Sequence, residues 1–382
     1  MTGFSPYPTP IVENVPGIYI HVPFCVSKCP YCNFYSLPAE ESLMDAYTEQ
    51  LLRALDEAAA IWNKDCDSLY FGGGTPILLG DRRIGRIIDR AREKFGLDGA
   101  EITLEANPAS TLENTLRGLF AAGVNRLSFG LQSADETELR LLGRRHTAKE
   151  AADAVRHAQQ AGFSNISLDL MLALPGQSEE TVCKSIDFCA ETGVSHISSY
   201  LLKVEEGTPF YADGVALRCP DGDRSADLYL AAVEHLQKRG FLQYEISNFA
   251  KDGFHSRHNC KYWLGAEYLG LGPAAHSMMG GRRMYFPRDL RGFLAAEHPL
   301  SLMVDDGVGG SAEEYALLGL RLCQGIEKAA AKAAHPTFDW DGLWKKAAVY
   351  QKAGYLRLDE NRLAFTPEGF LLSNAVLARI LP

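Results

Sequence analysis

Short apolar runs alternate with longer amphipathic stretches from residue 17 to residue 201. The apolar runs are typical of buried strands and span residues 17–22, 68–71, 101–105, 126–131, 166–170 and 196–201. Between them, apolar positions recur at the spacing of one helix face in residues 42–62, 84–95, 112–122, 149–161 and 179–191. Such alternation predicts a parallel sheet with right-handed crossovers. Six units predict an α/β fold, an open partial (β/α)6 barrel.

The pattern changes near residue 221. A helix is predicted at 223–238, followed by an aromatic and histidine-rich stretch from 244 to 276. The glycine-rich run 304–310 indicates a linker. Helices at 312–323 and 340–353, with a hairpin of 355–358 and 362–366, predict a small helical, winged-helix-like C-terminal domain. We therefore expect an N-terminal extension (1–16), a barrel (17–220), a helical and aromatic extension (221–305) and a C-terminal domain (311–382).

Polar residues follow the C-terminal ends of successive predicted strands. A cysteine-containing loop follows the first strand, and Gly72-Gly-Gly-Thr-Pro76 follows the second. Glu105, Gln132 and Asp169 lie at the ends of the third, fourth and fifth strands. In β/α architectures, sites are built on the face where the strands end. We therefore expect one functional site on this face.

Three cysteines on the first loop carry the most specific chemistry. Cys25, Cys29 and Cys32 have the spacing C-x3-C-x2-C. Three thiolates on a short loop can hold three irons of a [4Fe-4S] cluster, which normally takes four cysteines, and so leave one iron open. Zinc held by the cysteines and His21 is the alternative. Disulfides are not expected, because the chain has nine cysteines and nothing marks it as secreted.

An open iron takes a ligand with an amine and a carboxylate, and S-adenosylmethionine (SAM) fits. The glycines 72–74 permit close backbone approach, although an ordinary tight turn would use them too. Arg144 can pair a carboxylate in a bidentate fork, or can simply lie on a solvated helix face. Partners for the amine and hydroxyl groups, and aromatic faces beside the cluster, are Glu105, Gln132, Asp169, Tyr19 and Tyr31.

Composition narrows the function classes. The formal net charge of −10 and the pI near 5.5 argue against broad binding to nucleic acid. The sequence has no apolar run of the ~20 residues that a membrane helix needs, and residues 1–17 have no apolar signal-peptide core. We therefore expect a cytoplasmic protein. Peripheral association with a membrane and a homodimer are both compatible with the sequence.

Five motifs together resemble those of the radical SAM superfamily. They are Tyr19-Ile-His-Val-Pro-Phe-Cys-x3-Cys-x2-Cys, Phe71-Gly-Gly-Gly-Thr-Pro, Leu104-Glu-Ala-Asn-Pro, Ser128-Phe-Gly-Leu-Gln and Asp169-Leu-Met-Leu-Ala-Leu-Pro-Gly-Gln. The resemblance, which runs from Tyr19 to the tail, implies a radical SAM barrel with a [4Fe-4S] cluster on Cys25, Cys29 and Cys32. It also implies SAM contacts from Tyr19, Gly73, Glu105, Gln132, Arg144 and Asp169. Tyr31, Gly74 and Thr75 match positions that contact a second SAM molecule in the oxygen-independent coproporphyrinogen III dehydrogenase.

The chain departs from that dehydrogenase at two points. The dehydrogenase has C-x3-C-x2-C-x-C, whereas Phe34 occupies the last position here, and only 18 residues precede Tyr19. Both departures match a sister family, the radical SAM heme chaperones (HemW type). Ser256-Arg-His-Asn-Cys-Lys-Tyr-Trp263 is similar to the H-N-x-x-Y-W motif of that family. The resemblance implies heme, heme-accepting apoproteins and an electron donor for the cluster as partners.

Heme requires an axial ligand and an apolar aromatic wall. His258 is a candidate ligand, with Tyr262 and Trp263 as the wall, and His276 is a second candidate; core packing is the alternative role for such a stretch. The leading hypothesis is a heme chaperone, with SAM cleavage expected and enzymatic activity left open. The alternatives are the decarboxylating dehydrogenase and a radical SAM enzyme that opens heme to a linear tetrapyrrole.

Overall fold

The computed structural model describes residues 15–110 and 112–382. The N-terminal extension predicted for residues 1–16 therefore falls almost wholly outside the described residues. Within the described ranges, no helix is both long enough and apolar enough to cross a membrane.

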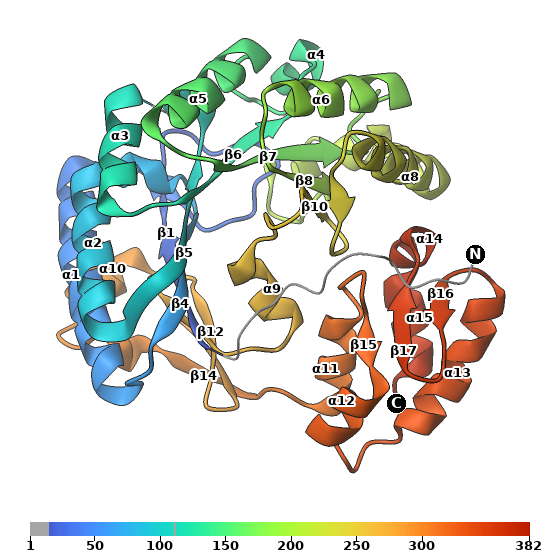
Figure 1. The fold of residues 1–382 in the computed structure, drawn as a ribbon. Coiled ribbons are helices and arrows are strands. Elements are labelled where there is room, and N and C mark those ends of the chain that lie inside the picture. The colour runs from blue at the N-terminus through green and yellow to red at the C-terminus, as the bar shows by residue number, and fades with distance from the viewer. Residues whose placement is uncertain (1–14, 111) are drawn as a thin grey trace.

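One mixed sheet organises most of the described chain (Figure 1). All six strands predicted from the sequence are present, and they lie side by side in chain order, each parallel to the next. They are β1 (Gly17–Val22), β4 (Cys66–Gly73), β5 (Gly96–Ala106), β6 (Arg126–Gln132), β7 (Asn165–Leu172) and β8 (His196–Leu201). The predicted α/β class and open parallel barrel are confirmed, and the C-terminal ends of the strands share one face.

A further parallel strand, β11 (Tyr268–Leu271), pairs with the other edge of β1. This strand was not predicted from the sequence, because its four residues lie inside the aromatic stretch. Gly17 pairs with Tyr268 and Ile20 with Leu271. Strand β1, which leads directly to the cysteines, is therefore hydrogen-bonded on both sides, to β4 and to β11.

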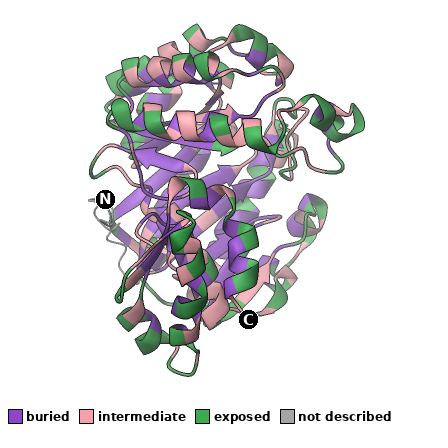
Figure 2. Ribbon diagram, turned by 90° about the vertical axis from the view of Figure 1, so that its right-hand side faces the viewer, coloured by how far each residue is buried: buried purple, intermediate pink, exposed green. Residues whose placement is uncertain are grey.

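Amphipathic helices cover the outside of the parallel strands. They are α1 (Glu41–Ile61), α2 (Gly80–Phe95), α3 (Glu113–Ala122), α5 (Ala148–Ala161), α6 (Glu179–Glu191) and α8 (Gly222–Lys238). In Figure 2 the strands are mostly buried, and the helices alternate buried and exposed residues. Leu51, Leu55 and Ile87 are fully buried between helix and sheet. Each such burial contributes about 1.5–3 kcal/mol to folding.

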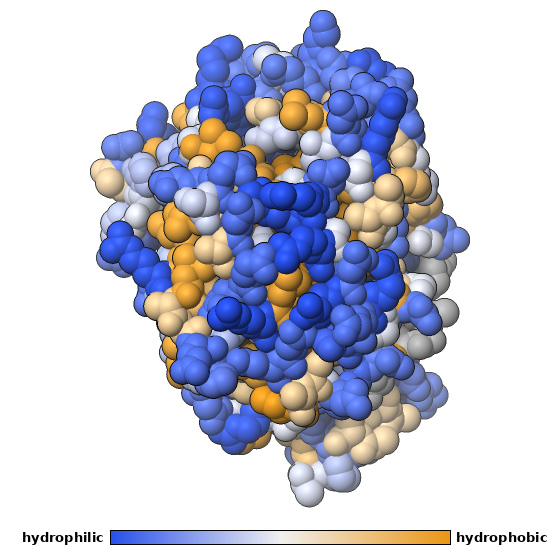
Figure 3. Space-filling view, turned by 90° about the vertical axis from the view of Figure 1, so that its left-hand side faces the viewer, coloured by the Kyte–Doolittle hydropathy of each residue, from blue (hydrophilic) through white to orange (hydrophobic). Residues whose placement is uncertain are grey.

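The outward faces of α1 and α2 are charged. Arg83 of α2 pairs with Glu41 and Asp45 of α1, and Arg86 pairs with Glu49. The space-filling view of this side of the molecule is mostly hydrophilic, with scattered hydrophobic side chains (Figure 3). Scattered apolar groups among charged ones are typical of a solvated surface.

Antiparallel strands extend the sheet at both edges. Strands β10 (Asn248–Ala250) and β9 (Leu242–Gln243) follow β8. On the other side, β12 (His276–Met279), β13 (Arg282–Tyr285) and β14 (Val304–Val308) follow β11. Residues 304–308 were predicted as part of a linker, and this was wrong: their amide groups pair with β13 in spite of the glycine and aspartate content. The extension predicted to be helical thus contains much of the edge sheet.

Shorter elements complete this part of the chain. They are β2 (Phe24–Cys25), β3 (Leu37–Pro38), α4 (Glu136–Leu141), α7 (Pro209–Ala212), α9 (Arg257–Trp263) and α10 (Leu290–Ala295).

Residues 312–380 form a small unit with its own apolar cluster. Its elements are α11 (Ala312–Gly319), β15 (Ile326–Glu327), α12 (Lys328–Ala334), α13 (Trp340–Lys352), β16 (Leu356–Leu358), β17 (Arg362–Phe365), α14 (Pro367–Leu371) and α15 (Ser373–Ile380). The predicted hairpin is confirmed as β16 and β17, and β15 adds a third strand. Trp340, Leu343 and Phe365 are at most 2% exposed. This is the small C-terminal domain expected from the sequence.

Backbone hydrogen bonds join this small domain to the sheet. The amide of Ile246 donates to the carbonyl of Arg321, and that of Cys323 donates to the carbonyl of Tyr244, both at 3.0 Å. Helix α9 packs against α11 in the same region. The segment after β9 therefore holds the small domain against the barrel.

Candidate functional site

The three cysteines lie on the loop that leaves β1. Cys25 ends β2, which pairs in parallel with β3 and closes the loop. Within the loop, the amide of Cys32 donates to the carbonyl of Cys29 at 3.0 Å. All three thiols are free and half-buried. Uncrosslinked thiols that solvent and iron can reach are the donors that a [4Fe-4S] cluster requires.

The histidine considered for a zinc site is engaged elsewhere. His21 is only 4% exposed, its Nδ1 lies 3.1 Å from the hydroxyl of Tyr19, and its Nε2 lies 3.0 Å from the carbonyl oxygen of Tyr35. Across residues 15–110 and 112–382, no group of three His, Cys, Asp or Glu side chains converges as ligands of one metal ion do. A cubane cluster binds each thiolate on a different iron, so its ligands need not converge. With both ring nitrogens engaged, His21 is not available as the fourth ligand of the predicted zinc site.

The glycine run at the end of β4 contacts the segment that leads to the cysteines. Gly73 has a φ of +108°, and a Cβ at this position would lie 2.6 Å from Cε1 of His21. The amides of Gly74 and Thr75 donate to the carbonyls of Val22 and Phe24, at 2.8 and 2.7 Å. The run therefore does more than turn the chain, because it fastens β4 to the strand that carries the first cysteine.

Thr75 and Arg144 bring polar groups to the cysteines. The Oγ1 of Thr75 lies 3.5 Å from the Sγ of Cys25. The Nη1 of Arg144 lies 3.5 Å both from the Sγ of Cys29 and from the hydroxyl of Tyr31. The buried Nε of Arg144 has no hydrogen-bond partner among the described residues. The arginine thus does not lie on a solvated helix face, and it keeps a donor for a carboxylate.

Gln132 adopts a backbone conformation that glycine would normally supply. Its φ is +74°, and the pairing of β6 with β7 is irregular between Phe129 and Gln132. A Cβ on Gly130 would lie 3.0 Å from Nε2 of Gln132 and 3.2 Å from Nη2 of Arg144. The bulge therefore places the glutamine amide next to the guanidinium. Left-handed non-glycine residues of this kind are enriched at functional sites.

Glu105 and Asp169 place two carboxyl groups inside the barrel. Glu105 accepts hydrogen bonds from the hydroxyl of Tyr70 at 2.9 Å and from the amide of Gly73 at 3.2 Å. Burial, with the charge of Asp169, raises the pKa of Glu105 to about 7 in spite of these bonds. Burial also raises the pKa of Asp169, which accepts from Ser128 at 3.1 Å. Both groups suit ligands that donate hydrogen bonds.

Several interior residues beside the site were not predicted from the sequence. Tyr70, Arg126 and Ser128 are buried and point into the same interior as Glu105 and Asp169. The available signal was a polar side chain at every second position of a buried strand, for example Ser68 and Tyr70, Arg126 and Ser128, or Ser167 and Asp169. Alternation of this kind marks one face of a strand.

The histidine of the predicted heme motif is buried beneath helix α9. His258 is 0% exposed, with Nδ1 2.9 Å from the Oγ of Ser68 and Nε2 2.8 Å from the hydroxyl of Tyr262. Glu101 accepts hydrogen bonds from the amides of Arg257 and His258 at the start of the helix. Burial lowers the pKa of His258 to about 3, so the ring is neutral. In this structure both ring nitrogens are occupied, as in a core-packing histidine.

The other heme candidates are more accessible. Trp263 and Tyr262 line neighbouring pockets beside the small C-terminal domain. His276 is exposed at the start of β12, where its ring stacks on Tyr285 with centroids 5.6 Å apart. The predicted SAM and cluster residues thus come together at the strand ends, whereas the predicted heme residues divide between a buried helix face, two pockets and an exposed strand.

Comparison with protein families matches two segments of the chain. Residues 19–189 match the radical SAM superfamily, and residues 311–372 match the HemN C-terminal domain. The first segment contains every predicted cluster and SAM residue. The second covers most of the small C-terminal unit.

Relatives align over almost the whole chain. The heme chaperone HemW of Mycobacterium tuberculosis is 36% identical over 96% of this chain and 94% of its own length, and that of Bacillus subtilis is 32% identical over 95% and 98%. The mitochondrial radical S-adenosyl methionine domain-containing protein 1 of Bos taurus is 33% identical over 100% and 90%. Among solved structures, the coproporphyrinogen III oxidase HemN of Escherichia coli covers 97% of this chain and 91% of its own, with a TM-score of 0.82 and 21% identity, a likeness of fold.

Proposed function

Because this chain belongs to the radical SAM superfamily, and within it to the family of the heme chaperones named HemW, we propose that it binds heme and delivers it to target apoproteins. Similarity over nearly the full length of relatives that carry this name is the observation on which the proposal rests. This similarity extends through the barrel, helix α9 and the small C-terminal domain.

Membership of the superfamily implies a [4Fe-4S] cluster and SAM. We assign the cluster to Cys25, Cys29 and Cys32, whose free, half-buried thiols share one loop. When bound, the cluster supplies an electron for reductive cleavage of SAM. The protein's own residues position the cofactor and exclude water from it.

The SAM molecule would be held by groups that the structure leaves ready for it. The Nε of Arg144 suits the carboxylate of SAM, and Glu105 suits its ammonium group or a ribose hydroxyl. The other assigned contacts are Tyr19, Tyr31, Gly73, Gly74, Thr75, Gln132 and Asp169. Gly73 contributes through its backbone, since a Cβ would meet His21.

Phe34 distinguishes this proposal from a decarboxylating dehydrogenase. It occupies the position of a fourth cysteine in that enzyme, and its side chain is 66% exposed beside the cluster loop. An exposed phenylalanine offers neither a thiolate nor a proton, so any chemistry that needs the fourth cysteine is absent at that position. An apolar group there suits contact with another apolar surface.

The remaining partners follow from the proposed activity. The proposed activity requires heme-accepting apoproteins and an electron donor for the cluster, and we place it in the cytoplasm. A homodimer and a peripheral contact with membranes are compatible with it.

A transfer experiment tests the proposed function. The cluster-reconstituted protein is loaded anaerobically with stoichiometric heme, freed of excess, and mixed with apomyoglobin as a generic acceptor. We expect saturable heme binding and growth of the myoglobin Soret band at the expense of the chaperone complex. Failure to bind heme, together with SAM-dependent release of carbon dioxide from coproporphyrinogen III, would instead identify the dehydrogenase. Linear tetrapyrrole products from heme would identify a degrading enzyme.

A further inference from the structure

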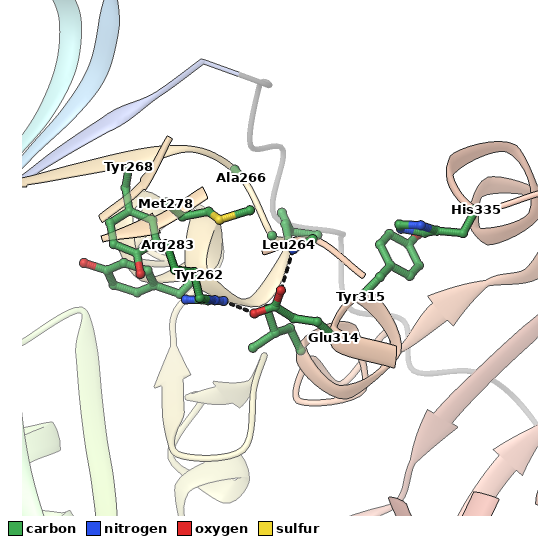
Figure 4. Close-up of a pocket in the computed structure, with 12 residues that line it drawn as sticks. Tyr262, Leu264, Ala266, Tyr268, Met278, Arg283, Glu314, Tyr315 and His335 are labelled. Carbon is green, nitrogen blue, oxygen red and sulfur yellow. Dashed lines mark hydrogen bonds and ion pairs between the residues drawn. The ribbon is translucent and has the colours of Figure 1, made fainter. Parts of the chain in front are cut away.

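Two neighbouring pockets lie between the small C-terminal domain and helix α9 with the strand that follows it. The larger, of about 330 Å³, is walled by Tyr262 and Tyr268 on one side and by α11 on the other (Figure 4). The smaller, of about 170 Å³, is lined by Trp263. Leu264 and Tyr315 line both pockets, which we together call the interdomain groove. The volume of the larger pocket lies at the lower end of the range of ligand pockets, roughly 300–1,000 Å³.

The groove has the surface that a flat apolar ring requires. The rings of Tyr262 and Tyr268 meet edge to face with centroids 4.6 Å apart. Met278 and Leu318 add apolar atoms to the same pocket. Both aromatic residues at the end of the H-N-x-x-Y-W motif thus face the groove, whereas its histidine lies behind Tyr262 and bonds to the Tyr262 hydroxyl.

A different histidine lines the groove. His335 follows α12, is half-buried and lines the larger pocket. Its ring lies 5.3 Å from that of Tyr315, centroid to centroid, and neither ring nitrogen is hydrogen-bonded within the described residues. An imidazole with a free nitrogen is able to ligate heme iron. His258, with both nitrogens hydrogen-bonded and no exposed surface, offers no free nitrogen to a ligand in the groove.

A cation for the heme carboxylates also lies in the groove. Arg283 of β13 is about one-third exposed and forms an ion pair with Glu314 of α11, across the pocket (Figure 4). The second carboxylate oxygen of Glu314 accepts a hydrogen bond from the amide of Gly310 at 2.5 Å. If Arg283 exchanged this partner for a propionate, Glu314 would keep the hydrogen bond from Gly310 to its other carboxylate oxygen. The pair also links the edge of the large sheet to the small domain, so the exchange would loosen that link.

From this geometry we propose that heme binds in the interdomain groove with His335 as its axial ligand and Arg283 paired to a propionate. The inference rests on the proposed heme-chaperone function and specifies its cargo site. Heme would then lie between the barrel and the small C-terminal domain, away from the strand ends that carry the cluster residues. Loading and release would depend on the contact between α11 and β13, whereas SAM binding would not.

Heme titration of the cluster-reconstituted full-length protein tests the site, with ferric protoporphyrin IX as the probe. His335→Gly is expected to weaken heme binding at least ten-fold and to shift the Soret band. Added imidazole is expected to restore the wild-type spectrum, which a merely structural role of the histidine would not allow. The matched control is His298→Gly, which alters an exposed histidine outside the groove and should bind heme as the wild type does.

A second variant keeps the test decisive if His335→Gly folds poorly. Leu318→Trp fills the larger pocket without removing any proposed ligand, and it is expected to abolish stoichiometric binding while far-ultraviolet circular dichroism and cluster absorbance stay unchanged. If both variants bind heme as tightly as the wild type, and His276→Ala loses it, the groove is overturned but the proposed function stands. If the wild type itself binds no heme, the proposed function fails and the site with it.

Discussion

Gly73 and His21 are in contact across two paired strands, so closely that a Cβ on the glycine would lie 2.6 Å from the imidazole. The imidazole is fixed in turn by the Tyr19 hydroxyl and the Tyr35 carbonyl. The position of the glycine loop, the orientation of Tyr19 and the path of the chain beyond the cysteines are therefore determined together.

Gly73→Ala is expected to weaken SAM binding by more than its loss of folding stability alone would cause. The added methyl would be strained by the φ of +108° and would displace His21. Strain at such a position costs about 1–3 kcal/mol. Gly80→Ala is the matched control, because Gly80 also has a positive φ but nothing within 4 Å of its Cβ position. Equilibrium dialysis with SAM should separate the two variants, and equal affinities would contradict the role of the contact.

Arg144→Ala is expected to lower SAM affinity ten- to one-hundred-fold. Removing a charge-assisted hydrogen bond costs about 1.5–3 kcal/mol, and the guanidinium also contacts Cys29 and Tyr31. Arg145→Ala, which removes the exposed neighbouring arginine, should leave affinity unchanged. Calorimetric titration with SAM measures both, and wild-type affinity in the first variant would refute the assigned carboxylate role.

Replacing Cys25, Cys29 or Cys32 with alanine should abolish the stable cluster. Each thiolate would bind a separate iron, so two remaining cysteines leave two irons without a protein ligand. Iron analysis and the broad visible absorbance after anaerobic reconstitution provide the measurement. Cys183→Ala, a change at a half-buried cysteine of α6, should keep full iron content. Retention of the cluster in the alanine variants would remove the ligand assignment.

His258→Ala is expected to destabilise the fold by about 2–4 kcal/mol, because it leaves the buried hydroxyls of Ser68 and Tyr262 without partners and opens a cavity. His298→Ala, at an exposed position, should change the free energy of unfolding by no more than about 0.5 kcal/mol. Urea denaturation measures both. A variant of His258 with unchanged stability but no heme binding would identify this histidine as the ligand after all.

Glu245→Gln should stabilise the protein at pH 8 and not at pH 5. Glu245 is 0% exposed, and burial raises its pKa to about 7. A raised folded-state pKa means that stability is lost as pH rises from about 4.5 to about 7, by up to roughly 3 kcal/mol. The amide carries no charge and escapes this loss. Glu360→Gln, at an exposed position, serves as the control, and a gain that did not grow with pH would contradict the prediction.

The repeating part of the fold was predictable because each element there has a local signature. Strands β1 and β4–β8 are apolar runs, and the helices between them keep a regular apolar face. Strands β11 and β14 lack such a signature. Four residues of β11 and the glycine-containing β14 become strands only through pairing with β1 and β13. That pairing depends on contacts between distant parts of the chain.

The strand-end residues of the site were predictable for a related reason. Parallel strands bring their C-terminal ends to one face, so Glu105, Gln132 and Asp169 gather there whatever the details of packing. The burial of His258 was not predictable, because it follows from where α9 packs under the barrel. The position of His335 beside the interdomain groove was not predictable either, because its alanine-rich surroundings give no chemical pattern.

The parallel pairing of β1 with β11 has a consequence for synthesis of the chain. Strand β1, which leads to the cysteines, is synthesised before β11, so one of its edges stays unpaired until residue 271 has been made. An unpaired apolar edge is prone to join another chain, and pairings this distant in sequence form slowly. Iron delivered before β11 arrives would meet a loop whose supporting strand is anchored on one side only. Cluster insertion is therefore expected to be a late, largely post-translational event in the maturation of this protein.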